Sequence, residues 1–543
     1  MIHPTAVMTE TRPSGRGRSR PGAGAVVVAL FACAVFVLGA TWAISTPAPS
    51  GTDEPAHYIR ALAVARGELT GPHALFPFRD PSHPDAVYFW DQTTRAFQLP
   101  ARIAPAATFA CTEGDPSLPA TCVSGSRCKR WAAACTVDPP TTGTVTVVSY
   151  LGVYEPTAYV LPGLLAQLAN NDVNGLRFAR MGSVLLMTAL IALTVALLWE
   201  RRRAAYSLLG LIVATTPMLV SINGVLNANG AEIVSSLTFT AALVRLWRDR
   251  EAVPRWVWVA AGISGSVCAF SRFLGPLWIV IDTLTVVAIL GVRPTLGIVR
   301  KGGRAAAFAL AATGSGLLAD LIWWQVVVGL PHARRPLSFF TDNITTQTGY
   351  LQTVLQQEIG RFGWGDTGMG SVGYIIWGSM ALALLSLAFV VGTPRQRLIL
   401  GASAGASLVF AVVAGSITTV AWDFEGPGIL GRYLLPWSVG IALVAGEIVC
   451  ANVHRLRDLA PRNLVLYFVA AAAACHAIAL WMVARRFAVG VNGPLMFLGK
   501  SAWRPPLGWG PWIVTGLVGC GLLVAAGTVA RRAQAREPAG GIV

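Results

Sequence analysis

Long apolar runs alternate with short polar segments along most of this chain of 543 residues. Many of the runs approach the roughly 20 residues that a helix needs to span a lipid bilayer. We therefore expect an all-α polytopic membrane protein with about 12 transmembrane helices. The expected spans cover residues 23–45, 177–199, 205–222, 231–247, 256–273, 275–292, 305–328, 370–392, 398–420, 433–451, 464–484 and 511–530.

The charge pattern gives these spans an orientation. Only 13% of the residues are charged, and the net charge is +16. The basic residues form short clusters between apolar runs, which is the distribution that the positive-inside rule describes for cytoplasmic loops. This pattern argues against a nucleic-acid partner. It predicts that both chain ends, 1–22 and 531–543, are basic cytoplasmic tails.

The chain then divides into a first anchor, a loop and a bundle. The run at 23–45 is long for a secretory signal, so we expect an uncleaved first transmembrane helix. Residues 46–176 form a large first external loop, and 177–530 form the transmembrane bundle. Inside the loop, tyrosines precede an apolar stretch over about 150–169, which predicts a helix lying at the outer membrane interface.

The cysteines fall into two groups. Five lie in apolar runs and are expected to be small buried residues: Cys33, Cys268, Cys450, Cys475 and Cys520. Four lie together in the external loop, at spacings that do not match a zinc pattern. We expect them to form two disulfides, with three pairings open: Cys111, Cys122, Cys128 and Cys135.

A polar stretch directly after the first span carries the strongest candidate chemistry. Asp53, Glu54, His57, Tyr58 and Arg60 lie within eight residues of each other. If Pro55 opens a helix, side chains three and four residues apart share a face where a membrane segment meets water. The alternative is that the acids only cap that helix.

Other unusual polar residues fall on the same predicted outer side. They include the asparagines at 223–229, the segment Gly363-Trp364-Gly365-Asp366, and Arg432 at the start of a span. The cytoplasmic loops are short, and the chain has no Walker-type phosphate-binding motif and no internal repeat. These features disfavour an ATP-driven pump and a transporter built from inverted halves.

The architecture resembles the GT-C class of integral-membrane glycosyltransferases. Several motifs are similar to those of one bacterial family of predicted membrane proteins in that class, catalogued as a domain of unknown function. The matching elements, in order, are Asp53-Glu54-Pro55 with His57, Arg60 and Gly67; Tyr154-Glu155-Pro156 with Tyr159; Gly363-Trp364-Gly365-Asp366; and Gly431-Arg432-Tyr433-Leu434-Leu435-Pro436. Two departures occur: Glu155 replaces a proline, and Asn227-Ala228-Asn229 lacks the family's acid, with Glu232 nearby but out of register.

The resemblance implies a transferase that uses a polyprenyl-phosphate sugar donor on the outer face of a bacterial inner membrane. The acceptor would be a cell-envelope glycan or glycolipid. Because the donor's leaving group is a phosphate at the membrane boundary, Arg432 is the expected phosphate ligand. The alternative for Arg432 is an anchoring ion pair with Asp423 or Glu425.

Inverting transfer needs a base that takes the proton of the acceptor hydroxyl. Asp53 is the first choice and Glu54 the second. The expected substrate-binding residues are His57, Arg60, Tyr154, Tyr159, Asn227, Trp364, Asp366, Arg432 and Tyr433. Structural alternatives stay open: a satisfied interfacial histidine for His57, a membrane-belt aromatic for Trp364, a helix cap for Asp366 and a simple turn for Asn227.

Some enzymes of this class use a divalent metal. Asp53, Glu54 and Asp366, with Asp423, would supply the oxygen ligands that a hard cation prefers. A transporter or flippase for lipid-linked sugars is the competing function, with Asp282 and Asp320 as the main ionisable residues inside spans. A third possible function is that of a non-catalytic scaffold held by the external loop. A wide separation of Asp53 and Arg432 would weaken the transferase hypothesis most.

Overall fold

The protein is largely helical. The structure, a computed structural model, describes residues 22–76, 89–105, 112, 115–121, 142–200, 203, 205–328, 338–422, 426–456 and 463–535. Its helices are α1 (Ala23–Ser45), α2 (Glu54–Ala65), α3 (Val160–Ala166), α4 (Asp172–Leu198), α5 (Leu209–Ala214), α6 (Pro217–Gly224), α7 (Ala228–Arg248), α8 (Arg255–Ala269), α9 (Gly275–Leu290), α10 (Val292–Trp323), α11 (Ser338–Gly349), α12 (Leu351–Gly360), α13 (Gly370–Val391), α14 (Pro394–Trp422), α15 (Gly431–Ala451), α16 (Leu464–Val489) and α17 (Trp509–Ala535).

The prediction of a multi-pass helical membrane protein is confirmed, but the count of about 12 spans is not. Within the described ranges, eight helices are long and apolar enough to cross a membrane, or nine if the bent pair α5–α6 is one span. The α8 helix has 15 residues and α9 has 16. At about 1.5 Å per residue, these are shorter than a hydrocarbon core of about 30 Å.

Two of the predicted spans differ from the structure because one is broken and the other belongs to a longer, bent helix. The span expected at 205–222 is broken between α5 and α6, which meet at 56°. The basic segment expected as a loop before 305 is helical and belongs to α10. That helix is bent at Gly303, whose backbone φ of 52° is outside the helical region.

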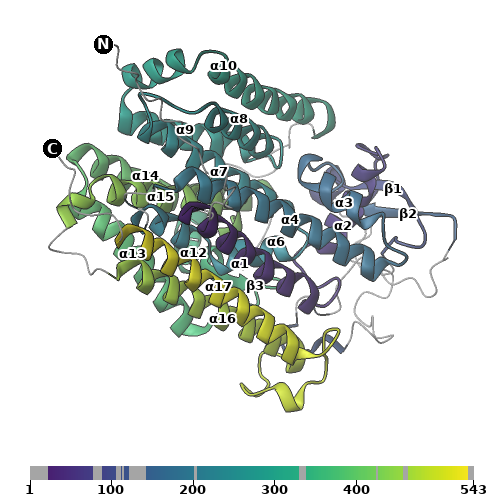
Figure 1. Cartoon of the computed structure of the whole chain (residues 1–543). Helices are drawn as coiled ribbons and strands as arrows, with labels where there is room; N and C mark the ends of the chain where they lie inside the picture. The colour runs from purple at the N-terminus through teal and green to yellow at the C-terminus, as the bar shows by residue number, and fades with distance from the viewer. Residues whose placement is uncertain are drawn as a thin grey trace, which may run out of the picture.

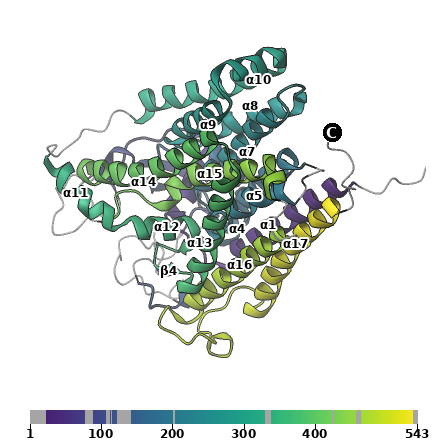
Figure 2. The ribbon, with the colours of Figure 1, turned by 90° about the vertical axis from the view of Figure 1, so that its left-hand side faces the viewer.

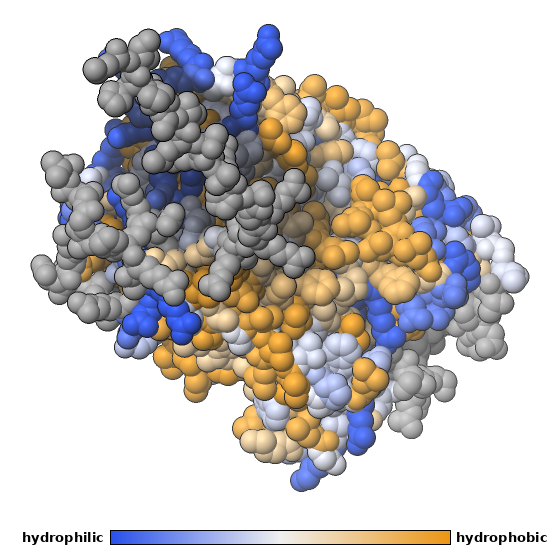
Figure 3. Space-filling model, in the orientation of Figure 1, coloured by the Kyte–Doolittle hydropathy of each residue, from blue (hydrophilic) through white to orange (hydrophobic). Residues whose placement is uncertain are grey.

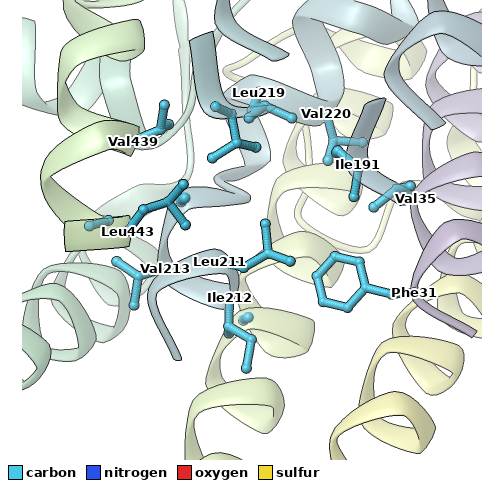
Figure 4. Close-up of a cluster of buried hydrophobic side chains, with 14 of the residues drawn as sticks. Phe31, Val35, Ile191, Leu211, Ile212, Val213, Leu219, Val220, Val439 and Leu443 are labelled. Carbon is cyan, nitrogen blue, oxygen red and sulfur yellow. The ribbon is translucent and has the colours of Figure 1, made fainter. Parts of the chain in front are cut away.

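The broken pair α5–α6 lies at the centre of the bundle. Figures 1 and 2 show α1, α16 and α17 side by side on one flank, and α8 beside α10 on another. The α5–α6 segments fill the space between α1, α4 and α15. Figure 4 shows the apolar side chains that meet there: Phe31 and Val35 of α1, Ile191 of α4, Leu211, Ile212 and Val213 of α5, Leu219 and Val220 of α6, and Val439 and Leu443 of α15.

The outer surface of the bundle is apolar where lipid is expected. Figure 3 shows hydrophobic side chains gathered across the middle of this face, with hydrophilic residues toward its ends. Exposed large apolar residues on α13 include Val372, Ile375 and Leu382. A soluble protein rarely exposes so much apolar surface, whereas a lipid-facing helix does so necessarily.

A small substructure that contains strands sits at one end of the bundle (Figure 1). Strands β1 (Arg95–Pro100) and β2 (Thr144–Ser149) pair antiparallel, with Phe97 opposite Val147, and pack against α2. The sequence pattern predicts helices alone, and the prediction is wrong for this pair of strands. The stretch predicted to lie at the membrane interface forms a short helix, a 3-10 turn at Thr157–Tyr159 followed by α3, and its interfacial position stays a prediction.

The structure describes five of the nine cysteines. Cys33, Cys268, Cys450, Cys475 and Cys520 are free, and all of them except the exposed Cys33 are buried. The four cysteines for which we expected disulfides lie outside the described residues: Cys111, Cys122, Cys128 and Cys135. The structure therefore gives no support to the predicted disulfides.

Candidate active site

The loop between α1 and α2 is held by a buried ion pair. Both carboxylate oxygens of Glu54 accept hydrogen bonds from Arg180 of α4, at 2.7 and 2.6 Å, and both side chains are 0% exposed. The backbone N–H groups of Gly51 and Leu226 also donate to Glu54, each at 2.9 Å. Because a buried charge needs this number of partners, the pair fixes where α2 starts relative to α4 and α7.

Asp53 has a different environment from its neighbour. It precedes α2 with a positive φ of 56°, and its side chain makes no capping hydrogen bond. Left-handed backbone is uncommon outside glycine, although aspartate tolerates it better than most residues. One carboxylate oxygen accepts a bond from the Tyr150 hydroxyl at 2.9 Å, and the other lies 3.3 Å from Nη2 of Arg432.

Arg432 reaches Asp53 from the first turn of α15. The two side chains come from positions far apart in the chain, and they remain 13% and 24% exposed. The Nε of Arg432 is buried and has no hydrogen-bond acceptor among the described residues. The neighbouring Gly431 allows this approach, because a Cβ at that position would clash with the backbone carbonyl of Val354 on α12.

A second guanidinium, that of Arg272, shares the ring of Tyr433 with Arg432 and was not among the residues predicted for the site. Arg272 follows α8 and is 1% exposed. Its charge centre lies 4.5 Å from the ring centroid of Tyr433, and that of Arg432 lies 5.2 Å from the same ring. Arg272 donates to Asn229 and lies 3.5 Å from Glu232. A lone arginine inside an expected span was the available signal, because such residues usually face a partner or a cavity.

His57 and Tyr159 form a buried pair beside these cations. The Nδ1 of His57 lies 2.7 Å from the Tyr159 hydroxyl. Burial, together with the positive charges of Arg272 and Arg432, holds the pKa of His57 well below its ordinary value of 6.5. The imidazole is therefore neutral at physiological pH.

Arg60 and Tyr154 are joined through the backbone. The guanidinium of Arg60 donates to the carbonyl oxygen of Tyr154 at 3.0 and 2.6 Å, and to that of Leu69 at 2.8 Å. The ring of Tyr154 in turn lies 5.4 Å from the charge centre of Arg272. Arg60 thus holds the segment that presents Tyr154, while Tyr154 contacts the cluster of cations directly.

The segment Gly363-Trp364-Gly365-Asp366 is the turn of a small hairpin. Strand β3 (Arg361–Phe362) pairs with β4 (Thr367–Gly368), and both turn glycines have positive φ. Asp366 lies 3.2 Å from Arg486 of α16 and accepts from Thr367 at 2.7 Å. The indole N–H of Trp364 is buried and has no acceptor among the described residues.

Asn227 caps α7. Its side-chain oxygen accepts from the backbone N–H of Asn229 at 3.0 Å, and its amide donates to the carbonyl of Thr52 at 3.2 Å. Thr52 also donates to the carbonyl of Gly363. These bonds connect α7, the Asp53 loop and the hairpin, so Asn227 positions the site in this structure.

A small cavity of about 40 Å³, open to solvent, lies between these elements. It is bordered by α1, α6, the β3 hairpin, α15 and α16, and we call it the reaction cavity. Its wall is mixed, with two arginines, Arg361 and Arg432, among hydroxyl and apolar side chains. The lining includes Trp42, Thr52, Ile222, Arg361, Phe362, Arg432 and Phe487.

The described part of the chain does not assemble the metal site that the sequence suggested. No group of three or more His, Cys, Asp or Glu residues comes together there. Asp53, Glu54 and Asp366 pair instead with three different arginines, Arg432, Arg180 and Arg486. Asp423, the fourth acid considered, lies outside the described residues, as does Glu425.

Residues 36–444 match the family described as predicted membrane protein (DUF2142). The chain belongs to that family. The match starts within α1 and ends within α15, so it includes the Asp53 loop, the hairpin and Arg432. A search of curated proteins finds no relative.

Among solved structures, the chain is similar to two crystal structures of ArnT from Cupriavidus metallidurans. One is bound to undecaprenyl phosphate and the other is in the apo state. The TM-scores are 0.36 and 0.35, at 14% sequence identity, and each comparison covers 70% of this chain and 67% of the ArnT chain.

The site of this DUF2142 member gathers some of the expected residues and separates others. Asp53, Arg432, Tyr433, Tyr154 and His57 form one connected cluster around Arg272. Asp366 is bonded to a different arginine, and Glu54 is sealed in its own pair. In this cluster the partly exposed carboxylate of Asp53 lies next to the guanidinium of Arg432. The Nε of that guanidinium has no acceptor among the described residues.

Proposed function

We propose that this protein is a GT-C-type glycosyltransferase that moves a sugar from a polyprenyl-phosphate donor to a cell-envelope glycan or glycolipid. The donor is membrane-borne because nucleotide sugars are not available outside the cytoplasm. The proposal places the site on the outer face of a bacterial inner membrane, with both termini cytoplasmic. The positive-inside pattern of the basic clusters supports this orientation.

The contact between Asp53 and Arg432 is the observation that carries the proposal. Transfer from a sugar phosphate needs a base for the acceptor hydroxyl and a cation for the departing phosphate. These two residues lie 3.3 Å apart, although 379 positions separate them in the chain, and Arg432 lines the reaction cavity. A scaffold protein has no need for this juxtaposition.

Asp53 serves as the base in this proposal. Glu54 is unsuitable because all of its acceptor sites face donors in a sealed pair. When the donor phosphate reaches Arg432, it takes over as that arginine's anionic partner. Asp53 is then released to accept the proton from the acceptor hydroxyl as the anomeric bond breaks, with inversion at the sugar carbon.

Several neighbours have supporting roles. Arg432 binds the phosphate through its free Nε and a second nitrogen, which matches the geometry of a phosphate oxygen pair. Arg272 adds positive charge from behind Tyr433, and the neutral His57 with Tyr159 and Tyr154 provides polar contacts for a sugar. Trp364 offers an unpaired indole N–H and a ring that suits a sugar face.

The test is transfer by the full-length protein in proteoliposomes. A panel of polyprenyl monophosphate sugars is supplied together with extracted envelope glycolipids, and released polyprenyl phosphate is measured by mass spectrometry. We expect release that falls by about 10²–10⁴-fold in the Asp53→Asn variant, the usual loss when a general base is removed. Glu251→Gln, a change in a solvent-exposed pair, is the matched control.

Two outcomes would count against the proposal. Wild-type turnover by a folded Asp53→Asn variant would remove the base assignment. Movement of the intact donor across the bilayer, without release of polyprenyl phosphate, would favour the transporter or flippase instead. The buried Asp282 and Asp320 would then be the first residues to test.

A further inference from the structure

Arg361 lines two cavities. On one side it lines the reaction cavity together with Arg432. On the other it lines a larger and more open hollow of about 460 Å³, which we call the lateral hollow. The remaining walls of the lateral hollow come from Gln352 and Gln356 of α12, Gly368 of the hairpin, and Ser371, Tyr374 and Ile375 of α13.

The charge of Arg361 is not balanced by an acid in the described part of the chain. Its Nε donates to the carbonyl of Gly365 at 2.5 Å, and its Nη1 lies 3.3 Å from the side-chain oxygen of Gln356. Both acceptors are neutral. By contrast, Arg432 and Arg486, the nearby arginines, each have an aspartate partner. A half-buried guanidinium with neutral partners favours an anionic ligand.

The lateral hollow adjoins a helix face that is suited to lipid. Ile375 lines the hollow and is 65% exposed, and Leu382 and Phe389 follow it at intervals of seven residues on the same exposed face of α13. That helix is one of the candidate membrane spans. A ligand whose charged group reaches Arg361 can therefore keep an apolar chain along α13.

We infer that Arg361 is a second phosphate-binding residue, and that the lateral hollow admits the headgroup of the polyprenyl-phosphate donor from the bilayer. This inference rests on the proposed function and specifies the donor's route. The phosphate first contacts Arg361 at the hairpin and then reaches Arg432 in the reaction cavity. The isoprenoid chain stays on the α13 face.

Direct binding tests the inference without requiring transfer. The full-length protein is placed in nanodiscs that contain phosphatidylglycerol. Because this anionic lipid is present throughout, binding that depends only on lipid charge is already saturated and is not counted. Binding of undecaprenyl phosphate is measured by native mass spectrometry, with inorganic phosphate as competitor. Arg361→Gln should weaken binding by about tenfold, the loss expected for a charge-assisted contact, and Arg361→Lys should weaken it less.

A second variant covers the case in which loss of Arg361 disturbs its own hairpin. Ser371→Trp places an indole ring in the lateral hollow and leaves Arg361 in place, and it should also weaken binding. Val372→Trp, which adds the same ring one residue away on the lipid-exposed side, should bind as the wild type does. Arg395→Gln, an exposed arginine that donates to the carbonyl of Ala288, is the control for loss of charge.

The outcomes separate this inference from the proposed function. Wild-type binding by both Arg361→Gln and Ser371→Trp would overturn the inference even if transfer occurs. Full displacement of the lipid by inorganic phosphate would overturn the lipid route in favour of a free-anion site. Binding that depends on Arg361, with no transfer from any donor, would support the inference and reject the proposed function. Where transfer is measurable, Arg361→Gln should raise KM for the donor more than it lowers kcat.

Discussion

Asp53 and Glu54 are adjacent acids whose carboxylates meet different arginines. The pair formed by Glu54 and Arg180 is fully buried, while Asp53 and Arg432 keep contact with solvent. Burial makes the first pair a structural element, because removing one partner leaves an uncompensated charge in a low-dielectric interior. Partial exposure leaves the second pair able to exchange partners.

We therefore predict that Glu54→Gln reduces stability strongly. Breaking a buried pair of this kind typically costs about 3–5 kcal/mol, because Arg180 is left without its anion. Thermal unfolding of the purified protein in detergent measures the effect. Glu251→Gln should leave the melting temperature unchanged, since its carboxylate is exposed to solvent. Equal effects from the two variants would contradict a structural role for Glu54.

We predict that the free energy of unfolding depends on pH through the buried carboxyl of Glu155. Burial raises its pKa from 4.5 to about 7. Between these values the native state binds more protons than the unfolded state, so stability is lost as pH rises from about 4.5 through 7. Glu155→Gln removes this titration. The variant should be more stable than the wild type at pH 8, by at most about 3 kcal/mol, with the advantage vanishing near pH 4.

This prediction is checked by melting curves of both proteins across that pH range. Glu251→Gln again serves as the control and should follow the wild-type curve. A constant difference between Glu155→Gln and the wild type at every pH would mean that packing, and not the proton, determines the effect.

At the level of elements, the start of α15 depends on close packing against α12. Gly431 donates its N–H to the side chain of Gln357 at 2.7 Å, and its Cα lies against the α12 backbone. The next residue is Arg432. The glycine of this Gly-Arg-Tyr element is thus required by backbone proximity, which places the guanidinium at the cavity.

Gly431→Ala should displace α15 from α12 and shift Arg432 away from Asp53. We expect a loss of stability of about 1–3 kcal/mol, the usual cost of overpacking, together with weaker transfer. Gly378→Ala is the matched control, because nothing lies within 4 Å of a Cβ at that position of α13. Melting temperature and release of polyprenyl phosphate are measured on both variants. A wild-type melting temperature and wild-type release in Gly431→Ala would show that α12 can move to accommodate the methyl group without displacing Arg432.

At the level of the whole molecule, the proposed orientation can be tested by cysteine labelling. Thr70 is exposed at the end of the bundle that carries Asp53, and Glu251 is exposed between α7 and α8 at the opposite end. A membrane-impermeant thiol reagent applied to intact cells should label Thr70→Cys above the wild-type background. It should label Glu251→Cys only after lysis. The reverse pattern would place the site in the cytoplasm.

Helix positions were largely predictable, because each depends on a local run of apolar residues. Predicted ranges such as 23–45 and 370–392 agree with α1 and α13 to within a residue. The break between α5 and α6 and the pairing of β1 with β2 were not predictable in this way. Both depend on contacts with distant segments, which a single run of residues does not encode.

The sequence by itself determined that the chain is a helical membrane protein and that unusual polar residues gather at a few places along it. Hydrophobic periodicity and charge clusters suffice for this, since both act locally. Only the tertiary structure decided the partners: Arg180 for Glu54, Arg432 for Asp53, Arg486 for Asp366, and no acid for Arg361 among the described residues. The physical reason is that a buried charge takes its character from the groups within a few ångströms, and folding, not chain order, brings those groups together.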